Sequence, residues 1–325
     1  MHPAFSVIFL TTLLGVGQGL FLALVTAQFY IAVNLLDIDQ PAQFYAIGTL
    51  ISLAFLGLGL VASFFHLGHP ERALKTIRQW RTSWLSREVI ALPAFMLFVI
   101  LYGAAHYFEI DFDVIQLSEN ITLSLTLSLG LIGTFLCFTL FICTGMIYAC
   151  IKFLQEWATP LTVLNFILMG GASGFTVAAV YAALIAPNLL NLFAGWAIAL
   201  TVMASIMRIF SLLRNARLKP KSTVKSAIGV RHSKIRQTAQ GAMGGSFNTR
   251  EYFHGKSINV VKFIKWLFLA LAFAVPLVLL SAGLIQKLTI LFIIAAIIQY
   301  LGLIAERWFF FAQANHPQNI YYQSA

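Results

Sequence analysis

Two side chains that can exchange protons near neutral pH stand at either end of one short basic segment of the sequence. His66 ends one apolar run and Glu88 opens the next. Histidine has an ordinary pKa of about 6.5, and burial can raise the pKa of a carboxyl group toward the same range. Because a single loop joins the two runs, both groups must lie on the same face of a membrane that the runs cross.

Cations surround this pair. Arg72 lies in the loop and Arg87 directly precedes Glu88, so either guanidinium can hold the carboxylate in its charged form or stabilise an anionic ligand. His69 is a further ionisable candidate. A quinone exchanges two electrons and two protons, and ionisable groups just inside a membrane usually have a function. These residues predict a site that moves protons to or from a membrane-soluble quinone.

A purely structural interpretation of the pair remains open. His66 can cap the carboxyl end of the helix that it follows, and Glu88 can complement the dipole at the start of the next helix. Trp80 and Trp84 are expected to belong to an interfacial aromatic belt rather than to stack on a quinone.

Composition identifies the class of protein that must position these groups. The chain of 325 residues is 60% hydrophobic and 10% charged, against roughly 45 to 50% apolar residues in soluble domains. Its apolar runs are continuous and reach the ~20 residues that a helix needs to cross a bilayer. We therefore predict an all-α, polytopic integral membrane protein, a single domain (1–325) that is a bundle of eight transmembrane helices. The predicted spans are 5–36, 42–65, 89–107, 121–150, 161–185, 189–213, 260–285 and 288–311.

The charges predict the orientation. Cations follow the second, fourth and sixth spans, the last as a series from Arg208 to Lys265, whereas the other side carries six acids and only Lys287. Since short cytoplasmic loops carry the excess of Lys and Arg, both termini are predicted to be cytoplasmic. The net charge of +10 then reflects topology, and no nucleic-acid partner is expected.

The loop at 214–259 is longer than topology demands. It is basic and rich in Gly and Ser, which suits contact with anionic lipid headgroups, a linker, or the docking of a peripheral subunit. The residues predicted to dock a partner are Arg78, Arg81, Arg250, Tyr252 and His254.

Other motifs argue mainly for packing. The three cysteines lie in the fourth span without metal-ligand spacing, and all seven histidines lie at helix ends, in loops or in tails, so neither a metal site nor a b-type haem is expected. Gln18, Gln28 and Asn165 are expected to form hydrogen bonds between helices. Glycine clusters at 15–19, 57–59 and 170–174 either allow close helix packing or break helices, and breaks would suit the alternative function, a secondary transporter for a small anion.

The specific motifs carry a resemblance. The run HLGHPERA at 66–73, followed by SREVI at 86–90, resembles the membrane anchor subunit of dimethyl sulfoxide reductase and of the related quinone-linked sulfite dehydrogenase. The opening MHPAFSVIFLTTLLGVGQGLFLAL, GGSFNTREYFHG at 244–255 and AERWFFFA at 305–312 are similar to that family too, particularly to its sulfite dehydrogenase branch.

The resemblance implies an anchor in a bacterial inner membrane that binds menaquinone or ubiquinone and is not itself catalytic toward the sulfur substrate. It implies two peripheral partners, an iron-sulfur subunit with four clusters and a catalytic subunit with a molybdopterin cofactor. The family's quinone-site residues match His66 and Glu88. The dimethyl sulfoxide reductase anchor holds its partners on the outer face, whereas the cations here place the His66 face inside, which favours the sulfite-oxidising branch.

Overall fold

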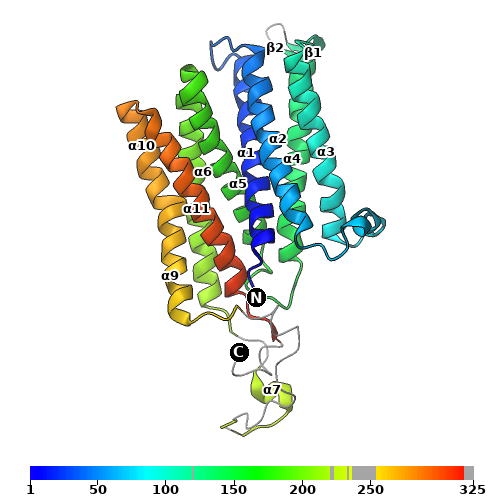
Figure 1. The fold of residues 1–325 in the computed structure, drawn as a ribbon, viewed down its shortest axis with the longest axis vertical. Helices are drawn as coiled ribbons and strands as arrows, with labels where there is room; N and C mark the ends of the chain where they lie inside the picture. Colours follow the sequence, from blue (N-terminus) through cyan, green and yellow to red (C-terminus); the bar gives the residue numbers. More distant parts are fainter. Residues whose placement is uncertain (119–120, 220–222, 233, 236–253, 318–325) are drawn as a thin grey trace.

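The structure, a computed structural model, describes residues 1–118, 121–219, 223–232, 234–235 and 254–317. Within these residues, eight helical segments are long and apolar enough to cross a membrane, and they run side by side as one bundle (Figure 1). The predicted all-α membrane bundle is thus confirmed. The spans are α1 (Phe5–Ala32), α2 (Ala42–Phe64), α3 (Trp84–Tyr107), α4 (Leu125–Ala149), α5 (Pro160–Ile185), α6 (Leu190–Ala216) after the short helix η2 (Pro187–Leu189), the run of α9 (Ile258–Leu269), η3 (Ala270–Ala274) and α10 (Val275–Gln286), and α11 (Thr289–Gln313).

Helices α1 and α5 form the centre of the bundle, where their glycines let the two backbones touch. A Cβ atom added to Gly174 would lie 2.1 Å from the carbonyl carbon of Gly19, and one added to Gly19 would lie 2.2 Å from the carbonyl oxygen of Gly170. Both helices continue unbroken through these positions. The glycines of α1 and α5 therefore serve close packing, and they do not supply the helix breaks that a transporter would use.

Polar side chains join neighbouring helices, as predicted. The amide nitrogens of three residues donate interhelical hydrogen bonds: Gln18 to the carbonyl of Cys137 at 3.1 Å, Gln28 to the hydroxyl of Thr126 at 2.7 Å, and Asn165 to the hydroxyl of Ser211 at 3.0 Å.

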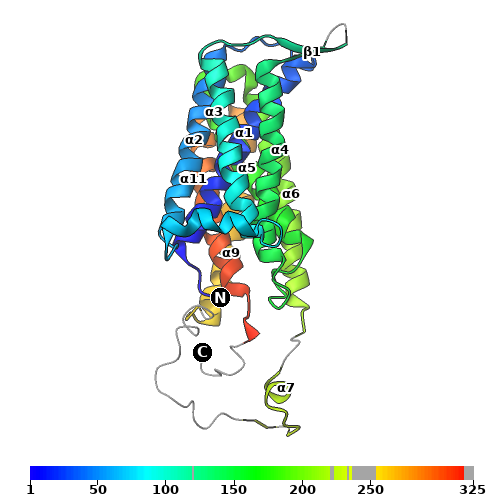
Figure 2. The same ribbon diagram turned by 90° about the vertical axis from the view of Figure 1, so that its right-hand side faces the viewer.

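The two ends of the bundle differ. One end, called here the loop face, carries the N-terminus, the 3-10 helix η1 (Pro70–Gln79), the connection from α4 to α5, the short helix α7 (Val224–Ile228) and the end of α11 (Figures 1 and 2). There the amino group of Met1 donates a hydrogen bond of 2.7 Å to the carbonyl of Ala314. The opposite end carries the antiparallel hairpin of β1 (Asp113–Ser118) and β2 (Ile121–Ser124).

Three predicted boundaries were wrong by four residues or more. Helix α1 ends at Ala32 rather than at residue 36. Helix α3 begins at Trp84 rather than at residue 89, because the hydroxyl of Ser83 caps it by accepting a hydrogen bond from the backbone N–H of Ser86. Helix α4 begins at Leu125 rather than at residue 121, because residues 121–124 pair with β1.

The seventh span contains a feature that the sequence did not predict. Its helix passes through a π-helical turn, η3, and Pro276 is the second residue of α10, which follows. A Cβ atom on Gly302 of α11 would lie 2.2 Å from the backbone nitrogen of Ala272. Helix α11 therefore packs directly against the backbone of the π turn.

Candidate functional site

Glu88 lies in the second turn of α3, about 6 Å along the axis from the first residue of the helix. Its side chain is half-buried, and its Oε1 accepts a hydrogen bond of 2.5 Å from the hydroxyl of Thr144 on α4. Thr144 is itself buried. The acid is therefore directed from the rim of the bundle toward its interior. The interior offers little water and few other groups that can bind a proton.

His66 lies just past the end of α2, and that end of the helix is at the loop face (Figure 1). Desolvation lowers the pKa of its imidazole below the usual 6.5, and a hydrogen bond with the backbone of Ala62 opposes that shift. The interaction with Ala62 places the imidazole beside the last turn of α2. Among the described side chains, the hydrogen-bond partner of Glu88 is Thr144 and not His66.

Arg87 donates its hydrogen bonds to backbone carbonyls of the loop and not to the carboxylate of Glu88. Its Nε donates to the carbonyl of Trp80 and its Nη2 to the carbonyl of Arg81, both at 2.9 Å, and its guanidinium lies 4.1 Å above the ring of Trp84. Successive residues of a helix point in different directions, so adjacency in sequence does not bring Arg87 onto Glu88. The guanidinium instead fastens the end of η1 to the start of α3.

The remaining predicted residues lie at or near the loop face. His69 and Arg72, at the start of η1, and Arg78 and Arg81, at its end, are exposed. The ring of His254 lies 6.4 Å from that of Trp308 near the end of α11. Arg250 and Tyr252 lie outside the described residues.

The structure also contains a buried charge cluster of three residues, Arg208, Glu306 and Arg307, that the sequence analysis missed. Nε of Arg208 lies 2.8 Å from Oε1 of Glu306, and Nη1 of Arg307 lies 3.2 Å from Oε2 of the same carboxylate. All three side chains are almost fully buried. The sequence analysis counted Arg208 with the loop cations although it falls inside the predicted span 189–213. That assignment was wrong, because Arg208 lies within α6 with its side chain buried in the bundle. Ionisable residues within apolar spans were the signal that could have identified the cluster.

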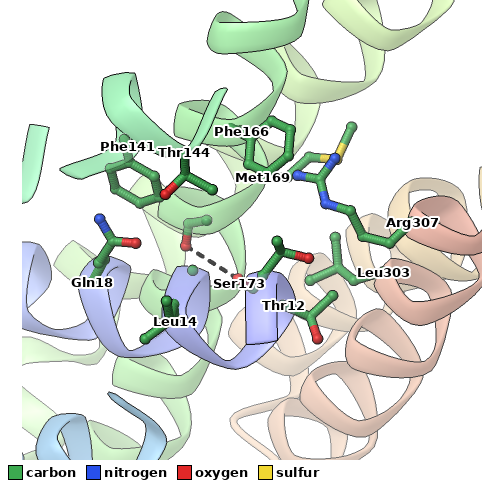
Figure 3. Close-up of a pocket in the computed structure, with 13 residues that line it drawn as sticks. Thr12, Leu14, Gln18, Phe141, Thr144, Phe166, Met169, Ser173, Leu303 and Arg307 are labelled. Carbon is green, nitrogen blue, oxygen red and sulfur yellow. Dashed lines mark hydrogen bonds between the residues drawn. The ribbon is translucent and has the colours of Figure 1, made fainter. Parts of the chain in front are cut away.

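A small cavity separates Thr144 from this cluster. It has a volume of about 20 Å³, enough for about one water molecule. Figure 3 shows Gln18 and Thr144 across the cavity from Arg307. Its polar lining consists of Thr11, Thr12, Gln18, Thr144, Ser173 and Arg307. Thr144 therefore contacts Glu88 and the cavity at once.

The comparison with known proteins agrees with the resemblance. The family described as DMSO reductase anchor subunit (DmsC) matches residues 1–312. A subunit of the sulfite dehydrogenase of Allochromatium vinosum is 54% identical over 324 residues, which cover 100% of this chain and 99% of that protein. An anchor subunit implies catalytic partner subunits in a complex. The chain belongs to the family of DMSO reductase membrane anchor subunits.

Proposed function

We propose that this protein is the quinone-binding anchor of a heterotrimeric molybdenum and iron-sulfur oxidoreductase, and that it links a cytoplasmic catalytic module to the quinone pool. The observation that carries the proposal is the Glu88 carboxylate, held inside the rim of the bundle by Thr144 at the end that also carries His66. The name of the Allochromatium vinosum relative favours sulfite as the electron donor over a reductive reaction of the dimethyl sulfoxide type.

The residues of the site act on protons. A bound quinone takes up two electrons and two protons when it is reduced. Glu88 delivers a proton from its carboxyl group and regains one afterwards, and the hydroxyl of Thr144 keeps that group oriented. His66, at the rim, exchanges protons between this site and the aqueous side through its imidazole.

The quinone ring is proposed to enter from the lipid. The cavity behind Thr144, of about 20 Å³, is far too small for a ring. Around the rim, however, Phe64, Phe65, Trp80 and Leu85 expose half or more of their surface. A ring that slides along these apolar side chains reaches the loop-face edge of α3 without crossing water.

The partners are proposed to dock at the loop face. Arg72, Lys75, Arg78 and Arg81 are exposed there, and a basic face in a short loop favours the cytoplasmic side. An iron-sulfur subunit with four clusters is expected to contact this face and to pass electrons from the molybdopterin catalytic subunit. The basic residues of the 214–259 loop are proposed to add to that interface.

The test replaces the carboxyl group of Glu88 with an amide, which has nearly the same shape but does not exchange a proton with the quinone. In the purified complex, Glu88→Gln should lower sulfite-dependent reduction of decylubiquinone by about a hundredfold. The content of the peripheral subunits and their reduction of an artificial dye should stay as in the parent complex. Asp113→Asn is the matched control, because Asp113 is an exposed acid at the hairpin end. Quinone reduction at the parent rate in Glu88→Gln would overturn the proposal.

A further inference from the structure

Glu88 forms no ion pair with another side chain among the described residues. Arg87, the neighbour expected to balance its charge, donates its hydrogen bonds to the carbonyls of Trp80 and Arg81. The titratable groups near Glu88 on α4 are the thiol of Cys143 and the phenol of Tyr148. Neither is a cation, and an ionised carboxylate in a low-dielectric site without a balancing charge is costly.

The charge cluster has the opposite imbalance. Arg208, Glu306 and Arg307 together carry two positive charges and one negative charge when all are ionised. Each side chain is at most 5% exposed. A charge that is buried in a membrane bundle without a partner of opposite sign is costly, because it has lost its hydration. The excess positive charge of the cluster is therefore expected to have a negative counterpart nearby.

The cavity lies between the charge cluster and the hydroxyl that binds Glu88. Thr144 donates to Glu88 and lines one side of the cavity, and Arg307 lines the other (Figure 3). Arg307 is held there by Glu306 and by the ring of Phe166, which lies 3.7 Å from its guanidinium carbon. The phenol of Tyr148, one turn beyond Thr144, interacts electrostatically with both Glu88 and Arg307.

Glu88 and Glu306 lie in the half of the bundle nearer the loop face. Glu306 lies about 10 Å along the axis from the loop-face end of α11, and Glu88 about 6 Å from the loop-face end of α3. The cavity between Thr144 and Arg307 has room for one water molecule, which can accept a hydrogen bond from Arg307 and exchange one with Thr144.

We propose that Arg307 is the cation that balances Glu88, acting across one water molecule in this cavity, and that it thereby sets how tightly Glu88 holds its proton. Arg307 acts on Glu88 and not on the quinone, so it is a positioning residue of the site. Glu306 and Arg208 hold it in place, and Glu306 also reduces the positive charge that Glu88 experiences. The inference rests on the proposed function, since it concerns the proton that Glu88 delivers.

The proposal predicts opposite effects of two charge changes in one cluster. Quinone reduction slows at high pH, once Glu88 has lost the proton that it must deliver. In Arg307→Gln the balancing cation is gone, Glu88 keeps its proton to higher pH, and the pH of half-maximal rate should rise by about one unit. In Glu306→Gln the net positive charge grows, and the same midpoint should fall. Arg307→Lys keeps the charge and should restore most of the parent profile.

The experiment records the pH profile of sulfite-dependent decylubiquinone reduction by the purified complex, divided by dye reduction at each pH. A merely structural role of the cluster would lower the rate without moving the midpoint in opposite directions. If Glu306→Gln does not assemble, the midpoints of Arg307→Gln and Arg307→Lys decide. A midpoint in Arg307→Gln that stays at the parent value overturns the inference while leaving the role of Glu88 intact, whereas full quinone reduction by Glu88→Gln removes both.

Discussion

The hydroxyl of Thr144 on α4 donates a 2.5 Å hydrogen bond to the carboxylate of Glu88 on α3. This bond directs an acid that starts at the edge of the bundle toward the cavity between α1, α4, α5 and α11. A hydroxyl that donates to a carboxylate favours its ionised form and fixes its direction. Thr144 is therefore the residue that joins the rim of the proposed site to its interior.

Replacing Thr144 tests that role directly. Thr144→Val keeps the shape of the side chain but removes the donor, and a hydrogen bond to a charged group contributes about 1.5 kcal/mol or more, so quinone reduction should fall roughly tenfold. Thr144→Ser restores the hydroxyl and should recover most of the rate. Thr176→Val is the matched control, because Thr176 is also buried but donates its hydrogen bond to the carbonyl of Ala172 in its own helix. Equal quinone reduction by Thr144→Val and the parent complex would contradict this prediction.

The pH dependence of His66 follows from its surroundings. Desolvation lowers the pKa of His66, so the imidazole is neutral at neutral pH and carries a proton to deliver only as the pH falls. The rate of quinone reduction, normalised to dye reduction, should therefore rise as the pH falls from about 7 to about 5. His66→Gln should remove the part of this rise that the imidazole supplies and leave the part that follows the protonation of Glu88. His232→Gln should keep the whole rise, because His232 is exposed beyond α7 and far along the chain from the site. A rise in His66→Gln as large as that of the parent would exclude the imidazole as a contributor.

The contact between α1 and α5 is expected to tolerate no side chain. Gly174→Ala would place a methyl group 2.1 Å from the backbone carbonyl carbon of Gly19, and backbone atoms cannot yield without separating the helices. Overpacking of this kind costs about 1 to 3 kcal/mol or more, so the unfolding temperature in detergent and the amount in the membrane should both fall. Gly195→Ala on α6 meets no atom within 4 Å and should behave as the parent. Similar unfolding temperatures for the two variants would show that the helices can separate at little cost.

The basic end of η1 is predicted to dock the peripheral subunits. Reversing Arg78 and Arg81 together to Glu changes two exposed cations of the loop face, and like charges across an interface weaken association. The peripheral subunits should then be released from membranes at lower salt than in the parent, as measured by their distribution after graded salt washes. Lys287→Glu changes an exposed cation at the opposite end of the bundle and should leave retention unchanged. Release at the parent salt concentration in the double variant would place the docking surface elsewhere.

The sequence by itself determined the class of fold, the spans and the separation of charge between the two ends. Hydrophobicity is a local property, so a run of apolar residues identifies a transmembrane helix whatever its neighbours are. Hydropathy also mislocates the starts of two helices, because these starts depend on other interactions. Helix α3 starts earlier than its apolar run because Ser83 caps it, and α4 starts later because residues 121–124 pair as a strand. The local nature of hydrophobicity also explains why His66 and Glu88 could be assigned to one end of the bundle before any contact was known.

Only the tertiary structure decided which polar groups meet. Glu88 lies next to Arg87 in sequence but bonds to Thr144, which is 56 residues away, and Arg208 pairs with Glu306 on a different helix. Such contacts depend on how each helix is rotated about its axis and on which helices pack together. Both are set by the packing of the whole bundle, including the glycine contact between α1 and α5, and no single segment contains that information.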